Sequence, residues 1–173
     1  MGIVSAPFTR ALYDRLPEGY PAQLVDGFLV HEPSPTCGHQ ALVLNLGMRL
    51  VGRVGIRRAF VAPVDVVLDD LNVVQPDVAV FATAPPLHER HDEIPVAVFE
   101  VLSPSNRDLD RDVKARKYLA AGVREVWIVD PDDETVEVRT LEGARTHRGD
   151  DAARSRVVGG FVVTPDELFA VLR

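Results

Sequence analysis

Apolar residues recur along the chain with two different periods, which predict helices and strands in turn. Residues 36–53 have the helical period, and their apolar stripe consists of His39, Val43, Leu46 and Leu50. A second helix is predicted over residues 108–121. It is ended by Gly122, the residue type most common just after a helix C-terminus. A short helix is expected at 8–16, and a last one begins at Thr164, which forms a capping box with Glu167.

Strands are predicted between these helices. A hairpin is expected around Asp26-Gly27, and residues 57–70 and 72–83 have the pattern of two paired strands joined by a turn. The apolar run from Val96 to Leu102 is typical of a central strand that is covered on both faces.

A further buried strand is predicted at 124–130, and the alternating residues 134–142 predict an outer strand of the same sheet. The unit from Val96 to Asp130 therefore has the order strand, helix, strand, which predicts a right-handed parallel crossover. The expected fold class is α/β, with a mixed β-sheet flanked by helices. One domain is expected over residues 1–173, with 1–7 loosely ordered.

Composition and charge narrow the class of protein. Hydrophobic residues make up 46% of the chain, and no apolar run is long enough to span a bilayer. The net charge of −7 argues against a dedicated non-specific nucleic-acid binder, but an enzyme with a local basic patch remains open. Cys37 is the one cysteine and the N-terminus does not resemble a signal peptide, so we expect a cytoplasmic protein without membrane contact.

Glu100 interrupts the buried strand 96–102, and a lone buried carboxylate needs a partner. Asp77 begins another predicted strand, and if the two strands are neighbours the two carboxylates converge. A hard divalent cation such as Mg²⁺ or Mn²⁺ would then compensate them. Lys114, on the following helix, is a candidate to orient an attacking water and to stabilise negative charge.

Each of these residues also has a structural interpretation. Asp77 follows Pro76 and suits a turn, and Glu100 could pair with an arginine. Lys114 lies four residues after Asp110 and could form an ordinary surface pair with it. Helical geometry does not choose between Lys114 and Lys117, because both lie at the border of the packed stripe. His39 is on the apolar stripe of its helix, where a histidine at the edge of the core is the more common case.

The chain has no GxGxxG, P-loop, HExxH or GxSxG motif, so the common nucleotide-binding, zinc-protease and serine-hydrolase functions have no support from sequence motifs.

Four quoted segments carry a resemblance to a known family: "YPAQLVDGFLVHEPSPTCGHQ", "QPDVAVF", "VAVFEVLSPSNRDLDRDVKARKYLAAGVREVWIVDP" and "GGFVVTPDELFAVL". Together they resemble the Uma-type family of putative restriction endonucleases, of the PD-(D/E)XK nuclease superfamily. The resemblance covers nearly the whole chain. It implies a restriction-endonuclease-like core and cleavage of phosphodiester bonds.

The resemblance also implies roles for single residues. Asp77 corresponds to the motif aspartate, Glu100 to the second acid, and Lys114 to a lysine placed four residues before Tyr118. Lys117 stays as the alternative lysine. His39 matches a position where the family commonly has a histidine.

Gln23 departs from the pattern, because family members often carry an acid there. Two hypotheses follow. The first is a Mg²⁺-dependent endonuclease that acts on nucleic acid, most simply DNA, through Asp77, Glu100 and Lys114. The second is a degenerate, non-catalytic member that acts as a homodimeric interaction or nucleic-acid-binding module.

Overall fold

The computed structural model describes residues 7–17, 19–31, 33–88, 92–103 and 109–173. Of the segment 1–7, which we expected to be loosely ordered, only Pro7 is among them. The helical elements are α1 (Arg10–Tyr13), α2 (Cys37–Val54), the π-helix η1 (Leu109–Lys114), α3 (Ala115–Ala120), α4 (Pro165–Phe169) and the 3₁₀-helix η2 (Ala170–Leu172). In the described part of the chain, no helix has the length and hydropathy to cross a membrane.

The strands form one large sheet and two small ones. They are β1 (Ala22–Val25), β2 (Phe28–His31), β3 (Ala59–Val61), β4 (Val66–Asp69), β5 (Asn72–Val74), β6 (Val78–Val80), β7 (Ala97–Val101), β8 (Glu125–Asp130), β9 (Thr135–Thr140), β10 (Gly143–Arg148), β11 (Ala153–Arg154) and β12 (Val162–Val163). The six-stranded sheet has the order β10-β9-β8-β7-β6-β3. Only β7 and β8 run parallel in it, so the mixed α/β fold expected from the sequence is confirmed.

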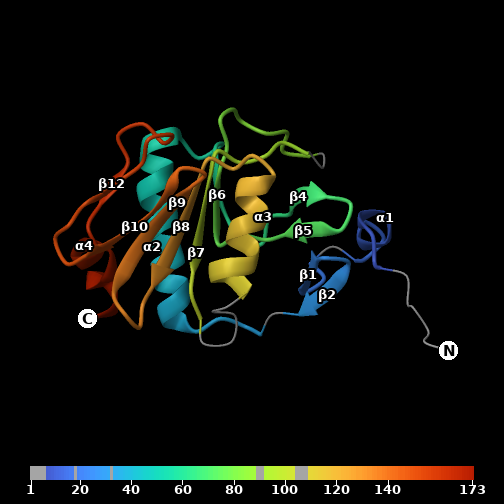
Figure 1. Ribbon diagram of the computed structural model, residues 1–173, viewed down its shortest axis with the longest axis horizontal. Coiled ribbons are helices and arrows are strands. Elements are labelled where there is room, and N and C mark those ends of the chain that lie inside the picture. Colours follow the sequence, from blue (N-terminus) through green and yellow to red (C-terminus); the bar gives the residue numbers. More distant parts are fainter. Residues whose placement is uncertain (1–6, 18, 32, 89–91, 104–108) are drawn as a thin grey trace.

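Helices cover both faces of the large sheet, and this explains why its central strands are apolar throughout (Figure 1). The face under α2 and α4 is lined by Phe99, Trp127 and Val129. The face under α3 is lined by Val98, Val126 and Ile128, and the small sheet adds side chains to the same core. Trp127 and Val126 therefore point to opposite faces, as the two-residue period of a strand requires.

The strands predicted over 57–70 and 72–83 do pair with each other, but each of them is two separate strands and not one continuous strand. The chain leaves the large sheet after β3 and forms the hairpin β4–β5. This hairpin belongs to the four-stranded sheet β2-β1-β5-β4, and the chain then returns to the large sheet as β6. Pro63 and Pro76 lie in the two crossings between sheets, where a missing N–H interrupts no ladder. Each long apolar run is thus divided between two sheets.

The strand expected at the edge, β9, lies inside the sheet, because β10 pairs along its whole length and forms the edge instead. β10 carries mostly exposed side chains and few apolar ones, so hydrophobic periodicity does not reveal it. The predicted hairpin at Asp26-Gly27 is confirmed, with φ values of 51° and 77° at these two residues. The capping box of Thr164 and Glu167 is also present.

The helix expected over 108–121 forms, but its first part is not α-helical. Residues Leu109–Lys114 form a π-helical turn, and α-helical geometry begins at Ala115. Asp108 lies outside the described residues. Gly122 follows α3 with φ of 104°, as a left-handed C-terminal residue should.

Candidate active site

The three residues predicted to carry the chemistry, Asp77, Glu100 and Lys114, line one cavity of about 630 Å³. His39 lines the same cavity. They come from four different parts of the chain: the residue before β6, the strand β7, the end of η1 and the first turn of α2. The convergence of residues this far apart in the sequence indicates a candidate site.

The strand register brings the two carboxylates together. β6 and β7 are antiparallel neighbours in which Val78 opposes Phe99. One step further along this register, Asp77 faces Glu100. Side chains that directly oppose each other in an antiparallel pair project from the same face of the sheet. Asp77 therefore projects toward Glu100, whichever role it also has in the turn after Pro76.

Glu100 is paired with Lys114 and Tyr118. The Nζ atom of Lys114 lies 2.8 Å from Oε1 of Glu100, and the hydroxyl of Tyr118 donates to the same oxygen at 2.7 Å. All three residues are at most 1% exposed. Lys114 and Tyr118 are one helical turn apart, so both reach one carboxylate from the same side of the helix. The partner of the buried carboxylate is thus a lysine, where the structural alternative expected an arginine.

Asp77 is held by the backbone of β7 and by His39. The N–H of Val101 donates to Oδ2 of Asp77 at 2.7 Å. The Nε2 atom of His39 lies 3.0 Å from the carbonyl oxygen of Val101 and 3.4 Å from Oδ2 of Asp77. A carbonyl oxygen only accepts, so Nε2 carries the proton of this contact. His39 is placed by the start of α2, where Thr36 accepts a hydrogen bond from its backbone N–H.

Three residues named from the sequence, Tyr118, Lys117 and Gln23, do not line this cavity. Lys117 forms an ion pair with Asp26, away from Glu100. The Oε1 atom of Gln23 accepts a hydrogen bond from the N–H of Gln75 at 2.7 Å, and its side chain borders a smaller neighbouring cavity. Gln23 therefore has a structural contact that an amide makes as well as a carboxylate does.

Sequence reasoning missed Asp132, which lines the cavity from the turn after β8. The signal was available: β7 and β8 are parallel, so residues that follow both strands meet at one edge of the sheet. With Asp132 included, three acidic side chains and one lysine are among the described residues that line the cavity, so the formal charge of this described part of the lining is negative.

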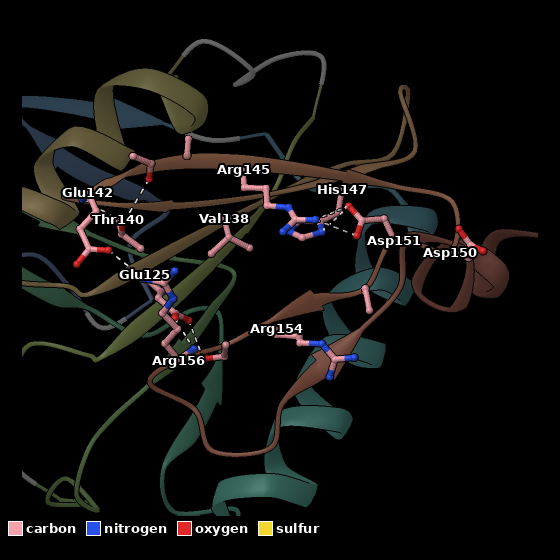
Figure 2. Close-up of a pocket in the computed structure, with 14 residues that line it drawn as sticks. Glu125, Val138, Thr140, Glu142, Arg145, His147, Asp150, Asp151, Arg154 and Arg156 are labelled. Carbon is pink, nitrogen blue, oxygen red and sulfur yellow. Dashed lines mark hydrogen bonds and ion pairs between the residues drawn. The ribbon is translucent and has the colours of Figure 1, made fainter.

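A larger cavity of about 920 Å³ lies beside β9, β10 and β11 (Figure 2). None of the predicted site residues lines it. Several of its charged groups contact each other: Arg145 and His147 contact Asp151, and Arg156 contacts Glu142. The smaller cavity therefore remains the candidate site.

Protein ligands for a metal are few. Within the residues that the structure describes, no three His, Cys, Asp or Glu side chains gather closely enough to hold an ion. Two carboxylates face each other, and Mg²⁺ commonly binds through one or two carboxylates while waters and phosphate oxygens complete its coordination. The carboxylates of Asp77 and Glu100 also accept hydrogen bonds from their neighbours, as metal-binding carboxylates usually do. The residues present therefore fit a hard divalent cation.

Comparison with known proteins places this geometry in context. Residues 10–165 match the Uma2 family, which is described as "Putative restriction endonuclease". The fold is similar to the crystal structure of a putative nuclease belonging to DUF820 from Anabaena variabilis ATCC 29413. The TM-score is 0.82 and the sequence identity 21%, and the similarity covers 96% of this chain and 100% of that one. No match is found among curated proteins.

Proposed function

This chain belongs to the Uma2 family of putative restriction endonucleases, and from that premise we propose that it is a metal-dependent nuclease that hydrolyses phosphodiester bonds in DNA. Asp77, Glu100 and Lys114 are its proposed catalytic residues. The observation that supports them best is that Lys114 is fixed 2.8 Å from Glu100 inside the cavity that Asp77 also lines.

Asp77 and Glu100 are the proposed ligands of Mg²⁺ or Mn²⁺. The described part of the cavity lining supports this assignment, because a phosphodiester is itself an anion and the three carboxylates there outnumber the one ammonium group. A divalent cation held by Asp77 and Glu100 would supply the compensating charge and would lower the pKa of a bound water.

The residues of the chain then have distinct tasks. The ammonium group of Lys114 stabilises negative charge that develops on the phosphate oxygens during attack by water. The hydroxyl of Tyr118, one helical turn after Lys114, donates a hydrogen bond to the Glu100 carboxylate and fixes its position. His39 and the N–H of Val101 fix the Asp77 carboxylate. In the net reaction the water oxygen bonds to phosphorus, the bond to the sugar oxygen breaks, and that oxygen takes up a proton.

The proposal also includes an oligomeric state, a cellular compartment and a type of nucleic acid. We expect a homodimer in the cytoplasm, and DNA as the nucleic acid. The alternative function, a degenerate homodimeric interaction or nucleic-acid-binding module, is favoured by Gln23, whose side chain is used within the fold.

A cleavage assay distinguishes the two functions. Purified protein is incubated with supercoiled plasmid, linear duplex, single-stranded DNA and RNA, each with Mg²⁺, with Mn²⁺ and with excess chelator. We expect metal-dependent cleavage of DNA that is lost in the Asp77→Asn variant. The same variant should fold normally by circular dichroism. Binding of nucleic acid without cleavage under every condition would support the degenerate module instead.

A further inference from the structure

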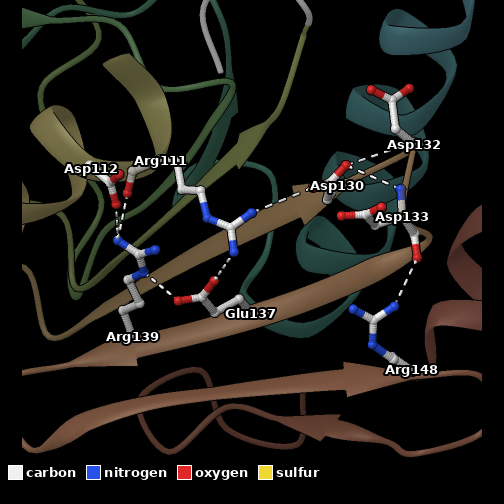
Figure 3. Close-up of polar contacts among 8 residues, drawn as sticks. All are labelled: Arg111, Asp112, Asp130, Asp132, Asp133, Glu137, Arg139 and Arg148. Atoms are coloured by element: carbon white, nitrogen blue, oxygen red, sulfur yellow. Dashed lines mark hydrogen bonds and ion pairs between the residues drawn. The ribbon is translucent and has the colours of Figure 1, made fainter. Parts of the chain in front are cut away.

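We propose that Arg111, Glu137 and Arg139 form a bracket that positions Lys114 against Glu100. These three residues lie outside the candidate cavity, and their proposed role rests on the function proposed for Lys114. They connect the π-helical turn η1 to strand β9 (Figure 3). Each is a positioning residue, since it acts through Lys114.

The bracket starts from a row of residues across three strands. Glu100 on β7 pairs with Ile128 on β8, and Ile128 pairs with Glu137 on β9. Paired residues project from the same face, so the two carboxylates lie on either side of Ile128 under the segment η1–α3. Both carboxylates are buried, with Glu100 1% and Glu137 7% exposed.

The helical segment provides one cation for each carboxylate. Lys114 contacts Glu100, and Arg111, three residues earlier, contacts Glu137 at 3.1 Å. A second contact of 3.6 Å joins Arg111 to Asp130, whose carboxylate also accepts hydrogen bonds from the β8–β9 turn. Two ion pairs on either side of Ile128 thus fix both the position and the rotation of the helical segment over the sheet.

Arg139 closes the bracket from β9. Its Nε donates to Glu137, while its Nη1 donates to the backbone carbonyl oxygen of Arg111 at 2.6 Å and lies 3.3 Å from Asp112. Burial alone would lower the pKa of Arg139, but its hydrogen bonds and attraction to Glu137 and then to Asp112 raise the pKa overall. Arg139 therefore remains charged and holds both the side chain and the backbone of the π-helical turn.

The contacts of Arg111 and Arg139 with β9 matter because the segment that they hold is π-helical. A π-helical turn is rare and occurs often at functional sites. Lys114 is the last residue of the turn. Relaxation of η1 to α-helical geometry would shift the register by one residue and rotate the residues before the turn by roughly 100° relative to α3. The segment could then no longer keep Arg111 on Glu137 and Lys114 on Glu100 at the same time, so contacts that hold η1 also hold the position of Lys114.

The composition of the chain permits a direct test. Lys114 and Lys117 are its only two lysines. We would acetylate the native protein and follow both lysines by mass spectrometry, using Lys117 as the internal reference. In the Glu137→Gln variant we expect Lys114 to react about tenfold faster, because local opening exposes it, while Lys117 keeps its rate. Glu142→Gln is the matched control, since Glu142 contacts Arg156 on the surface and should leave both rates unchanged.

Kinetics supply the second measurement. With a DNA substrate and Mg²⁺, Glu137→Gln should lower kcat on the order of 10–100-fold with KM nearly unchanged, because a small displacement of a catalytic group has an effect of this size. Glu137→Asp, which keeps the charge, should recover part of kcat. If Glu137→Gln does not fold by circular dichroism, Arg139→Lys replaces it, since that variant keeps the charge and loses the contact with the Arg111 carbonyl.

The outcomes test the bracket and the proposed nuclease function separately. Equal acceleration at both lysines would show general destabilisation and overturn the bracket, as would a wild-type rate at Lys114 in the variant that folds. If the wild-type protein cleaves no nucleic acid with either metal, the proposed function fails, while the acetylation rates still test whether the bracket positions Lys114.

Discussion

Lys114 and Glu100 form an ion pair that is almost completely buried, with Nζ 2.8 Å from Oε1 and side-chain exposures of 1% and 2%. A buried ion pair stabilises a fold little in total, but removal of one partner leaves an uncompensated charge in a medium of low dielectric constant. The pair is therefore a sensitive place to test both structure and function.

A double-mutant cycle tests the coupling of this pair. Glu100→Gln and Lys114→Met should each lower the free energy of unfolding by about 3–5 kcal/mol without metal, because each leaves the other charge unpaired. The double variant should be clearly more stable than the sum of the two losses predicts. Urea unfolding of the four proteins measures this; simple additivity would mean that the two charges do not interact.

Substitution of the two lysines tests the site assignment. Lys114→Met should lower the cleavage rate by about 10²–10³-fold, the typical effect of removing one group that stabilises transition-state charge. Lys117→Met is the matched control, because Lys117 pairs with Asp26 at the surface and should retain nearly full activity. Initial rates with one DNA substrate decide the point, and inactivity of the Lys117 variant alone would reverse the assignment.

Metal binding should stabilise the folded protein. At a Mg²⁺ or Mn²⁺ concentration 100 times the dissociation constant, the expected gain in unfolding free energy is about 2.7 kcal/mol. Thermal unfolding with increasing metal measures it. Asp77→Asn should remove the shift, whereas Asp26→Asn, a carboxylate outside the candidate cavity, should keep it. An equal shift in both variants would place the metal elsewhere.

Trp127 should be important for stability and unimportant for metal binding. Its side chain is completely buried, stacks on Phe99 with centroids 5.2 Å apart, and meets Phe161 edge-on at 5.4 Å. Trp127→Ala should cost about 3–5 kcal/mol through loss of burial and creation of a cavity. Denaturant unfolding measures this loss. A nearly neutral result would contradict the packing described for this face of the sheet.

The contribution of Arg139 should not depend on pH in the neutral range. Its pKa is raised above the usual value in the folded protein, so its stabilising effect is complete below the unfolded-state pKa and is lost only when the pH rises through the folded-state pKa. The stability loss of Arg139→Met should therefore be the same between about pH 6 and pH 10. A loss that changes strongly in this interval would indicate that another titrating group governs the contact.

The sequence by itself was sufficient for the elements that have a strong local signal. The period of α2, the Asp26-Gly27 turn, the capping box at Thr164 and the parallel unit β7–helix–β8 all follow from side chains close together in the chain. Glu100 could also be named, since a carboxylate inside an apolar strand is unusual enough to be noticed, and the family resemblance then implied roles for Asp77 and Lys114.

Local periodicity did not separate Lys114 from Lys117, because both lie at the border of one helical stripe. Only the tertiary structure shows that Lys114 lies beside Glu100 and Lys117 beside Asp26. The choice depends on the rotation of the helix over the sheet, which the π-helical turn and contacts with a strand more than twenty residues away determine. Hydrophobic period also did not predict that residues 57–83 are divided between two sheets. Hydrophobic period reports which side of a strand is buried, but the identity of the neighbour that buries it is fixed by contacts between segments distant in sequence.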